Sequence, residues 1–283
     1  MIYRILPRKI ASITSLLISS NYIRLKWSYQ LNVGDYLSPI IVKHISSYTP
    51  RYTSFDSNKP SLLAIGSILS RAKRDDVIWG SGFIKPGNKL VYNPYIISLR
   101  GKLSYDQLKN NFGYVKGHNI SFGDPGLLLS DVYNPHQKKK YDVGYIPHFV
   151  DYRLFIDRYK KNIKENDVII NVKNNYKNII RKINQCNYIA SSSLHGLVLA
   201  DAYKVPNTRI KLSDNIIGDD FKFDDYRSGI NASTYNVIDL RAGTKLNESM
   251  IKEYSSLVDC EEIKNQIKFS LESYLLKNRN QLN

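Results

Sequence analysis

Short apolar runs alternate with longer mixed segments along the central part of the chain, and each run is followed by turn residues. Continuous apolar runs of this length predict strands of parallel sheets that are covered on both faces. The expected strands share this pattern and lie at residues 61–67, 76–82, 95–101, 141–148, 166–172 and 187–193. Segments with helical patterning lie between them, at residues 103–111, 175–186 and 194–203. The alternation predicts an α/β fold.

One segment, "YNPHQKKKYD" at residues 133–142, interrupts this alternation with a proline and a run of lysines. Such a segment is typical of a linker. We therefore expect two Rossmann-type domains, an N-terminal one at residues 1–133 and a C-terminal one at residues 141–283. Residues 247–276 are expected to form one helix that closes the second domain.

Composition narrows the class of partner. The chain has 283 residues, of which 42% are hydrophobic, and a formal net charge of +16. Such a charge favours phosphorylated small molecules, acidic glycans, anionic lipid or nucleic acid. No zinc-finger spacing, RNA-binding aromatic signature or long basic helix occurs, so nucleic-acid binding is not predicted. The two cysteines, Cys186 and Cys260, are far apart and fit a reducing, cytoplasmic compartment.

The first 20 residues are basic and partly apolar. Ile10, Ile13 and Leu17 recur at helical spacing near Arg4 and Arg8. This pattern predicts an amphipathic helix, which either packs on the domain or lies on the inner face of the cytoplasmic membrane. The apolar part is too short to span a bilayer.

The segment "SSSLHG", residues 191–196, places three serines and a histidine where a strand meets a helix. Ligands of parallel α/β sheets bind beyond the carboxyl ends of the strands. A serine can cap the helix, whose first N–H groups and dipole bind anions. The same dipole disfavours imidazolium, so His195 is expected to be neutral and able to accept a proton. The alternative is a serine cap and a packed structural histidine.

Two other strand ends carry candidate donor-binding residues. In "WGSGF", Gly80 and Gly82 flank Ser81 and would let the backbone approach a ligand closely. In "SLRGKLS", Arg100 could hold a carboxylate or phosphate through two parallel hydrogen bonds. The alternative for Arg100 is a surface ion pair.

Two further residues are candidates of second rank. Asp35 follows Gly34 in a turn before a helix, where it either caps that helix or projects a carboxylate into the cleft. His148 follows the first strand of the second half and is either a loop histidine or faces the same cleft as His195. No grouping of histidine and carboxylates has metal-ligand spacing, so we expect no metal and no cofactor.

The order of the motifs resembles the polysaccharide pyruvyl transferase family, in particular its shorter members, which add ketal pyruvate to exopolysaccharide repeat units. The resemblance covers roughly residues 22–230 and rests on eight segments in sequence: "NVGDYLSP", "AIGSIL", "WGSGF", "LRGKLS", "GDPGLLL", "GYIPHFVD", "SSSLHGLVLADAYKVPN" and "FKFDDYRSG".

This resemblance implies a GT-B-like fold, with two Rossmann-type domains facing a central cleft. It also implies phosphoenolpyruvate as donor and a sugar diol as acceptor, on an oligosaccharide that is lipid-linked or free. The family signature falls on Ser191–Gly196, with His195 as general acid or base and Ser192, Ser193 and Leu194 at the donor. Many members have arginine where this chain has Ser193. The missing charge could come from Arg100, Arg153 or Arg209, or from the helix N-terminus.

Two other functions compete with pyruvyl transfer. The same fold suits a glycosyltransferase that uses a nucleotide sugar, although no carboxylate is clearly placed to bind a ribose. A non-catalytic protein that binds acidic glycan or lipid would explain the positive charge without any chemistry.

Overall fold

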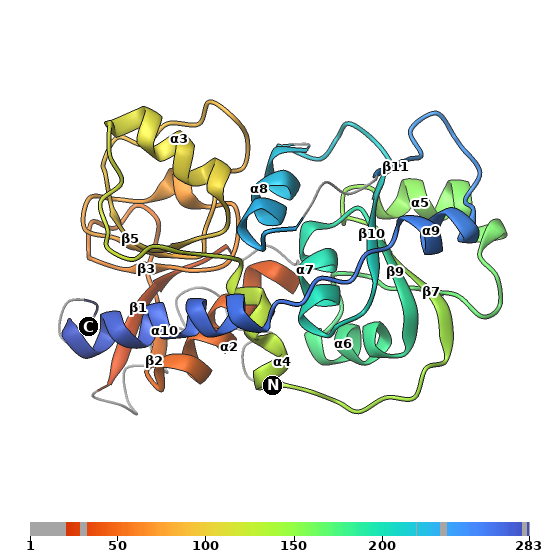
Figure 1. Ribbon diagram of the computed structural model, residues 1–283, viewed down its shortest axis with the longest axis horizontal. Helices are drawn as coiled ribbons and strands as arrows, with labels where there is room; N and C mark the ends of the chain where they lie inside the picture. Colours follow the sequence, from red (N-terminus) through yellow and green to blue (C-terminus); the bar gives the residue numbers. More distant parts are fainter. Residues whose placement is uncertain (1–20, 29–32, 219, 233–236, 279–281, 283) are drawn as a thin grey trace.

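The computed structural model describes residues 21–28, 33–218, 220–232, 237–278 and 282. Two sheets form the molecule, and all the strand pairs within them are parallel (Figure 1). Helices alternate with the strands, as the sequence predicted. The α/β class and the GT-B-like arrangement of two Rossmann-type sheets are therefore confirmed.

The first sheet has the strand order β2-β1-β3-β4-β5-β6. Its strands are β1 (Tyr22–Lys26), β2 (Thr49–Tyr52), β3 (Leu62–Leu63), β4 (Val77–Trp79), β5 (Tyr95–Leu99) and β6 (Ser121–Phe122). The helices of this half are α2 (Val33–Ser46), α3 (Lys102–Phe112) and α4 (Leu129–Val132), with 3-10 turns η2 (Leu69–Arg71) and η3 (Pro125–Leu128).

The second sheet has the strand order β11-β10-β9-β7-β8. Its strands are β7 (Tyr141–Ile146), β8 (Val168–Ile169), β9 (Cys186–Ser191), β10 (Asn207–Lys211) and β11 (Val237–Asp239). The accompanying helices are α5 (Tyr152–Tyr159), α6 (Tyr176–Asn184), α7 (Leu194–Ala202), α8 (Phe221–Gly229) and α9 (Glu248–Tyr254), with the 3-10 turn η4 (Lys160–Asn162).

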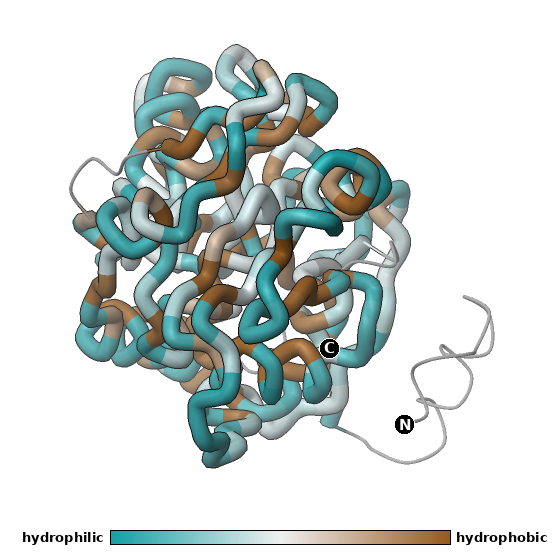
Figure 2. The backbone as a smooth tube through the Cα atoms, turned by 90° about the vertical axis from the view of Figure 1, so that its right-hand side faces the viewer, coloured by the Kyte–Doolittle hydropathy of each residue, from teal (hydrophilic) through white to brown (hydrophobic). Residues whose placement is uncertain are grey.

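The core joins the two halves. The largest cluster of buried apolar residues contains Leu25 of β1 and Leu128 of η3 together with Val198 of α7. Hydrophobic segments accordingly run through the interior of the molecule (Figure 2). Burial of this apolar surface favours the packing of one half on the other, and the N-terminal end of α7 is fixed near their junction.

The prediction of a single closing helix at residues 247–276 is wrong, because the structure has two helices there, α9 and α10. After α9 the chain leaves helical geometry, and Ser256 exchanges two backbone hydrogen bonds of 3.0 Å with Asn207 of β10. Helix α10 (Glu261–Lys277) then returns to the first sheet, where the indole Nε1 of Trp79 donates to the Ile267 carbonyl at 2.9 Å. The last helix therefore connects the two halves.

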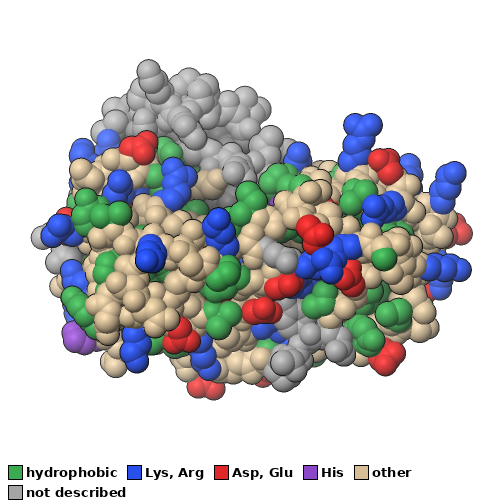
Figure 3. Space-filling view, turned by 90° about the horizontal axis from the view of Figure 1, so that it is seen from above, with side chains coloured by type: hydrophobic (Ala, Val, Ile, Leu, Met, Phe, Trp, Pro, Cys, Tyr) green, Lys and Arg blue, Asp and Glu red, His purple; other side chains and the backbone are tan. Residues whose placement is uncertain are grey.

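Lysine and arginine side chains are spread over both halves of the face in Figure 3, interspersed with acidic ones. None of the helices among the described residues is long and apolar enough to cross a membrane. The amphipathic helix expected at residues 1–20 lies outside the described residues.

Candidate functional site

The three serines between β9 and α7 have three different environments. The Ser191 hydroxyl donates to the Ile146 carbonyl at 2.9 Å and accepts the Ser193 N–H at 3.0 Å, so it fixes the turn. The Ser192 hydroxyl accepts the backbone N–H of His148 at 2.8 Å and joins the ends of β9 and β7. Ser193 is the N-cap residue, but its side chain makes no capping bond. A serine therefore occupies the N-cap position, as expected, but its hydroxyl does not cap the helix.

Two backbone N–H groups at the N-terminus of α7 have no acceptor among the described residues. The part of the chain that the structure describes offers no hydrogen-bond partner to the backbone N–H of Leu194 or His195. Leu194 is itself 4% exposed and packs in the core. Unpaired N–H groups and the helix dipole give this end a partial positive charge. The arrangement suits a bound anion.

His195 lies between α7 and the first turn of α2. A Cβ atom at Gly34 would be only 1.9 Å from the His195 Nδ1, so the imidazole occupies the space that the missing side chain leaves. The sequence suggested that Gly34 lies in a turn before the helix. Helix α2 begins at Val33, so Gly34 lies inside the helix instead. His195 is 8% exposed, and its Nε2 has no partner among the described residues.

Both histidines of the site are neutral near pH 7. Burial is the main cause that lowers the pKa of His195 to about 3, with smaller contributions from the positive charges of Arg100 and Lys222 and from coupling to His148. Burial also lowers the pKa of His148 to about 4, with a contribution from Lys222. The Nδ1 of His148 accepts the Val150 N–H at 3.3 Å, which leaves its Nε2 as the protonated nitrogen. The backbone of His148 is held next to the start of α7 by its bond to Ser192, and the prediction that its side chain faces the same cleft as His195 stays a prediction.

Arg100 is neither an open anion clamp nor a surface ion pair, the two roles that the sequence suggested. It is fully buried, and its Nε donates to the Asp225 carboxylate at 2.9 Å. Its two terminal nitrogens donate to the Ser67 hydroxyl at 2.6 Å and the Phe83 carbonyl at 2.5 Å. Because this buried guanidinium is held by protein groups, we assign it to positioning the two halves.

The partner of Arg100 comes from α8, which lies between the two halves (Figure 1). The Asp225 carboxylate also accepts the backbone N–H of Ser104 at 2.7 Å and the Ser104 hydroxyl at 2.8 Å. It therefore closes the N-terminus of α3. Gly101 permits this contact, because a Cβ there would lie 1.6 Å from the Asp225 carbonyl oxygen.

The glycines of "WGSGF" have a different explanation from the one expected. The space beside Gly80 is filled by the Pro125 ring, 2.1 Å from where a Cβ would lie. The space beside Gly82 is filled by Arg100 and Asp225, each 2.7 Å from such a Cβ. The Ser81 hydroxyl donates to the Gly66 carbonyl at 2.8 Å. All three residues contact protein groups, and their assignment to the donor stays a prediction.

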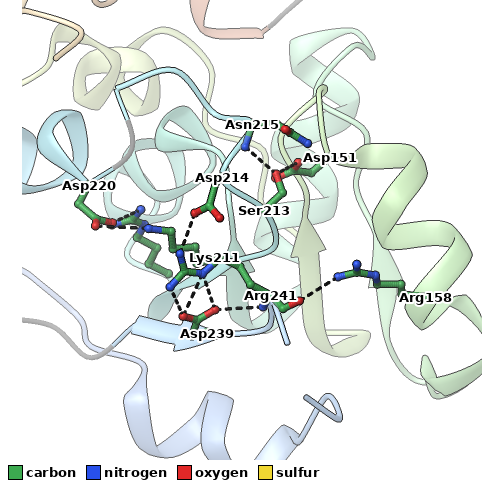
Figure 4. Close-up of polar contacts among 10 residues, drawn as sticks. Asp151, Arg158, Lys211, Ser213, Asp214, Asn215, Asp220, Asp239 and Arg241 are labelled. Atoms are coloured by element: carbon green, nitrogen blue, oxygen red, sulfur yellow. Dashed lines mark hydrogen bonds and ion pairs between the residues drawn. The ribbon is translucent and has the colours of Figure 1, made fainter. Parts of the chain in front are cut away.

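A carboxylate lies at the same edge of the second sheet. Asp151 is buried and accepts a hydrogen bond of 2.6 Å from the Ser213 hydroxyl, at the end of β10 (Figure 4). Its second oxygen has no partner among the described residues, and burial raises the pKa of this carboxyl. Asp35, the carboxylate that the sequence proposed, lies in α2, but its side chain is outside the described residues.

Sequence reasoning missed Lys222 of α8 and Asp225. Both are buried within a short helix whose sequence, "FKFDDYRSG", looks like an ordinary charged surface helix. Nothing local to the sequence pairs Asp225 with Arg100, since they are 125 positions apart. The signal that the sequence did offer was that "LRGKLS" and "FKFDDYRSG" both belong to the eight ordered segments.

The described residues of the site form no evident metal centre. No group of three or more His, Cys, Asp or Glu side chains that could hold an ion occurs in the described ranges. What the geometry does provide is an open helix end, two neutral histidines, a buried lysine and a buried carboxylate. These groups can bind an anion and transfer protons.

Comparisons with known proteins identify a family and two relatives. Residues 32–214 match the family model described as polysaccharide pyruvyl transferase. The chain is 28% identical over 182 residues to an uncharacterized protein of Acanthamoeba polyphaga mimivirus, covering 62% of this chain and 63% of that protein. It is 26% identical over 204 residues to the succinoglycan biosynthesis protein ExoV of Rhizobium meliloti (strain 1021), covering 68% of this chain and 60% of that protein. The chain thus spans less than two thirds of the length of either relative.

Proposed function

The chain belongs to the polysaccharide pyruvyl transferase family, and from that premise we propose that it transfers pyruvate from phosphoenolpyruvate to a sugar diol of a polysaccharide repeat unit. The products are a cyclic pyruvate ketal and phosphate. The observation that carries this proposal is the uncapped N-terminus of α7 beside the buried, unpartnered Nε2 of His195.

The donor carries a phosphate and a carboxylate, and the site has positive potential to receive them. The N–H groups of Leu194 and His195 bind one anionic group at the end of α7. The protonated Nε2 of His148 donates a further hydrogen bond from the end of β7. Phosphoenolpyruvate needs no metal or cofactor in this scheme, because the leaving group is already activated.

Chemistry begins with protonation of the donor methylene carbon, which makes the neighbouring carbon electrophilic. One sugar hydroxyl adds to that carbon and loses its proton. The second hydroxyl then displaces phosphate and closes the ketal ring. His195 transfers these protons through Nε2. A bound anion raises the pKa of His195 from its low value in the free protein, which brings it closer to the range useful for proton transfer.

Two features keep water from competing with the sugar. The imidazole of His195 is buried against Gly34, and the buried Arg100–Asp225 pair joins the two halves. A site that excludes water also strengthens each electrostatic contact within it. We infer that the acceptor enters from the side of His148 and Asp151, whose carboxylate can bind a sugar hydroxyl.

A substitution at His195 tests the proposal. We expect His195→Gln to reduce phosphoenolpyruvate-dependent pyruvylation of oligosaccharide acceptors by a factor of about 10² to 10⁴, the usual contribution of a general acid or base. Pyruvylation is measured as the gain in acceptor mass together with phosphate release. His136→Gln, in an exposed segment, is the matched control and should keep full activity. Undiminished turnover in His195→Gln would contradict the assignment.

A further inference from the structure

A pocket lies between α3, the loop that follows β4 and the start of α8. Its volume is about 320 Å³, near the lower end of the range of about 300–1,000 Å³ that is usual for small-molecule sites. Leu103 and other residues of α3 line it together with residues 87–89 and with Phe221 of α8. Helices α3 and α8 contact each other (Figure 1), so both halves of the molecule contribute to this pocket.

Contacts within the protein hold the pocket in shape. The Gln107 side-chain amide donates to the Asn88 carbonyl at 2.7 Å, which fixes the loop to α3. Gly218 lets the segment before α8 approach the same loop, because a Cβ there would lie 1.8 Å from the Ile84 carbonyl oxygen. The walls of the pocket are therefore formed before any ligand binds.

Three polar side chains that line the pocket remain available to a ligand. Within the described part of the chain, no hydrogen bond or ion pair involves the side chains of Lys89, Asp106 or Asn110. Asp106 and Asn110 are four residues apart on α3, so they share one face of that helix. Together the three residues offer an ammonium donor, a carboxylate acceptor and an amide that both donates and accepts.

Apolar surface lies beside these polar groups. Leu103 and Phe221 line the pocket and are half-buried, and Phe221 also packs against a cluster of buried apolar residues of the first half. The charges of Asp106 and Lys89 balance, although the whole chain carries +16. A sugar ring matches this surface, because it presents C–H groups on its faces and hydroxyls, which donate and accept, around its rim. An anion would suit the end of α7 better.

We propose that this pocket binds one sugar ring of the acceptor oligosaccharide. The inference rests on the proposed function and names a subsite for its acceptor. No residue that lines the pocket belongs to the end of α7, so the bound ring is a different one from the ring that receives pyruvate. Acceptors of two or more sugars should accordingly react better than single sugars.

Binding is tested without the donor, by saturation-transfer NMR with the methyl glycosides of glucose, galactose, mannose and N-acetylglucosamine. We expect at least one glycoside to bind, and Asp106→Ala and Asn110→Ala each to weaken its binding by about tenfold, the effect of one lost hydrogen bond. Both side chains are exposed in a helix, where alanine is well tolerated, so thermal unfolding should not change. Lys109→Ala is the matched control, because Lys109 is an exposed residue of α3 that does not line the pocket.

Kinetics distinguish a subsite from a structural role. With an oligosaccharide that the unchanged protein pyruvylates, Asp106→Ala and Asn110→Ala should raise the KM for the acceptor by about tenfold. The value of kcat and the KM for phosphoenolpyruvate should stay the same, because the lost contact is made equally in the ground state and the transition state. A general loss of structure would change all three values.

The outcomes separate the two proposals. If a glycoside binds in the pocket but phosphoenolpyruvate does not bind, the proposed function is overturned and the sugar site stands. If no glycoside binds, or if both alanine variants bind it as well as the unchanged protein does, the sugar site is overturned whatever the donor is. A fall in kcat in these variants would place the pocket at the reacting groups and contradict a separate subsite.

Discussion

Two helix N-termini of this protein follow strand ends and differ in how their backbone N–H groups are bound. At α3, the N–H of Ser104 is bound by Asp225, and the N–H of Lys102 is bound by the Ser228 hydroxyl at 2.9 Å. At α7, the Gly196 N–H bonds the Ser193 carbonyl at 3.0 Å, but the described residues provide no acceptor for the N–H groups of Leu194 and His195. Unpaired buried N–H groups are rare in folded proteins. The closed terminus therefore holds the molecule together, whereas the open one is free to bind an anion.

Opening the closed terminus should have the largest effect. We expect Asp225→Ala to lower the free energy of unfolding by about 3–5 kcal/mol, because it leaves Arg100 buried without its counter-charge. The measurement is urea unfolding. The control is Asp214→Ala, which breaks the exposed pair with Arg241 in Figure 4 and should cost less than about 1 kcal/mol. Equal losses in the two variants would contradict the structural role of Asp225.

Displacing the histidine beside the open terminus should reduce activity more than stability. In Gly34→Ala, the new methyl group would overlap the His195 ring and force it to move. A displacement of about 1 Å from the productive position lowers turnover by about 100-fold. Alanine favours the helix by up to about 1 kcal/mol, which offsets part of the strain. Turnover and thermal unfolding are measured together, and normal turnover would show that the His195 position is not critical.

The neutral state of His195 should appear in the pH dependence of stability. The unfolded chain protonates this histidine below about pH 6.5, but the folded chain does so only near pH 3, so unfolding takes up a proton between these values. As the pH is lowered from 6.5 to 5, the free energy of unfolding should therefore decrease by about 2 kcal/mol more in the unchanged protein than in His195→Gln. The raised pKa values of Asp124 and Asp201 make stability increase as the pH is lowered, but this effect is the same in both proteins. Parallel stability curves would refute a buried neutral imidazole.

Closing the open terminus should produce the smallest change in stability. Ser193 has the extended backbone of an N-cap residue, with φ −100° and ψ 130°. In Ser193→Asp, a carboxylate can accept an N–H of the first turn and should raise stability by up to about 1 kcal/mol. The same carboxylate competes with the donor, so phosphoenolpyruvate binding should be lost. Ser193→Ala should show neither effect, and an Asp variant that binds normally would mean that the donor lies elsewhere.

The elements themselves could be predicted because their signals are local. Helix α7 was expected at residues 194–203 and runs from Leu194 to Ala202, since an apolar helix follows directly from a buried strand and a turn. The parallel sheets followed from continuous apolar runs. His195 was identified for the same reason, as a residue immediately beyond a strand end.

The remainder of the site depends on contacts between distant segments. Nothing near Arg100 in the sequence indicates that Asp225 occupies its guanidinium. Gly34 resembles a turn glycine until the His195 ring is seen against it. The break between α9 and α10 arises because Ser256 pairs with β10, which helical periodicity cannot show. Sequence patterns therefore could not predict which residues of the two halves contact each other.

Thermal unfolding with a panel of ligands tests donor binding at the open end of α7 most directly. The panel contains phosphoenolpyruvate, UDP-sugars and GDP-sugars, and each is added to the unchanged protein and to Ser193→Asp. A ligand at about 100 times its dissociation constant adds about 2.7 kcal/mol of stability. We predict that phosphoenolpyruvate alone stabilises the unchanged protein and that Ser193→Asp removes the effect. Stabilisation by a nucleotide sugar alone would contradict pyruvyl transfer and indicate a glycosyltransferase.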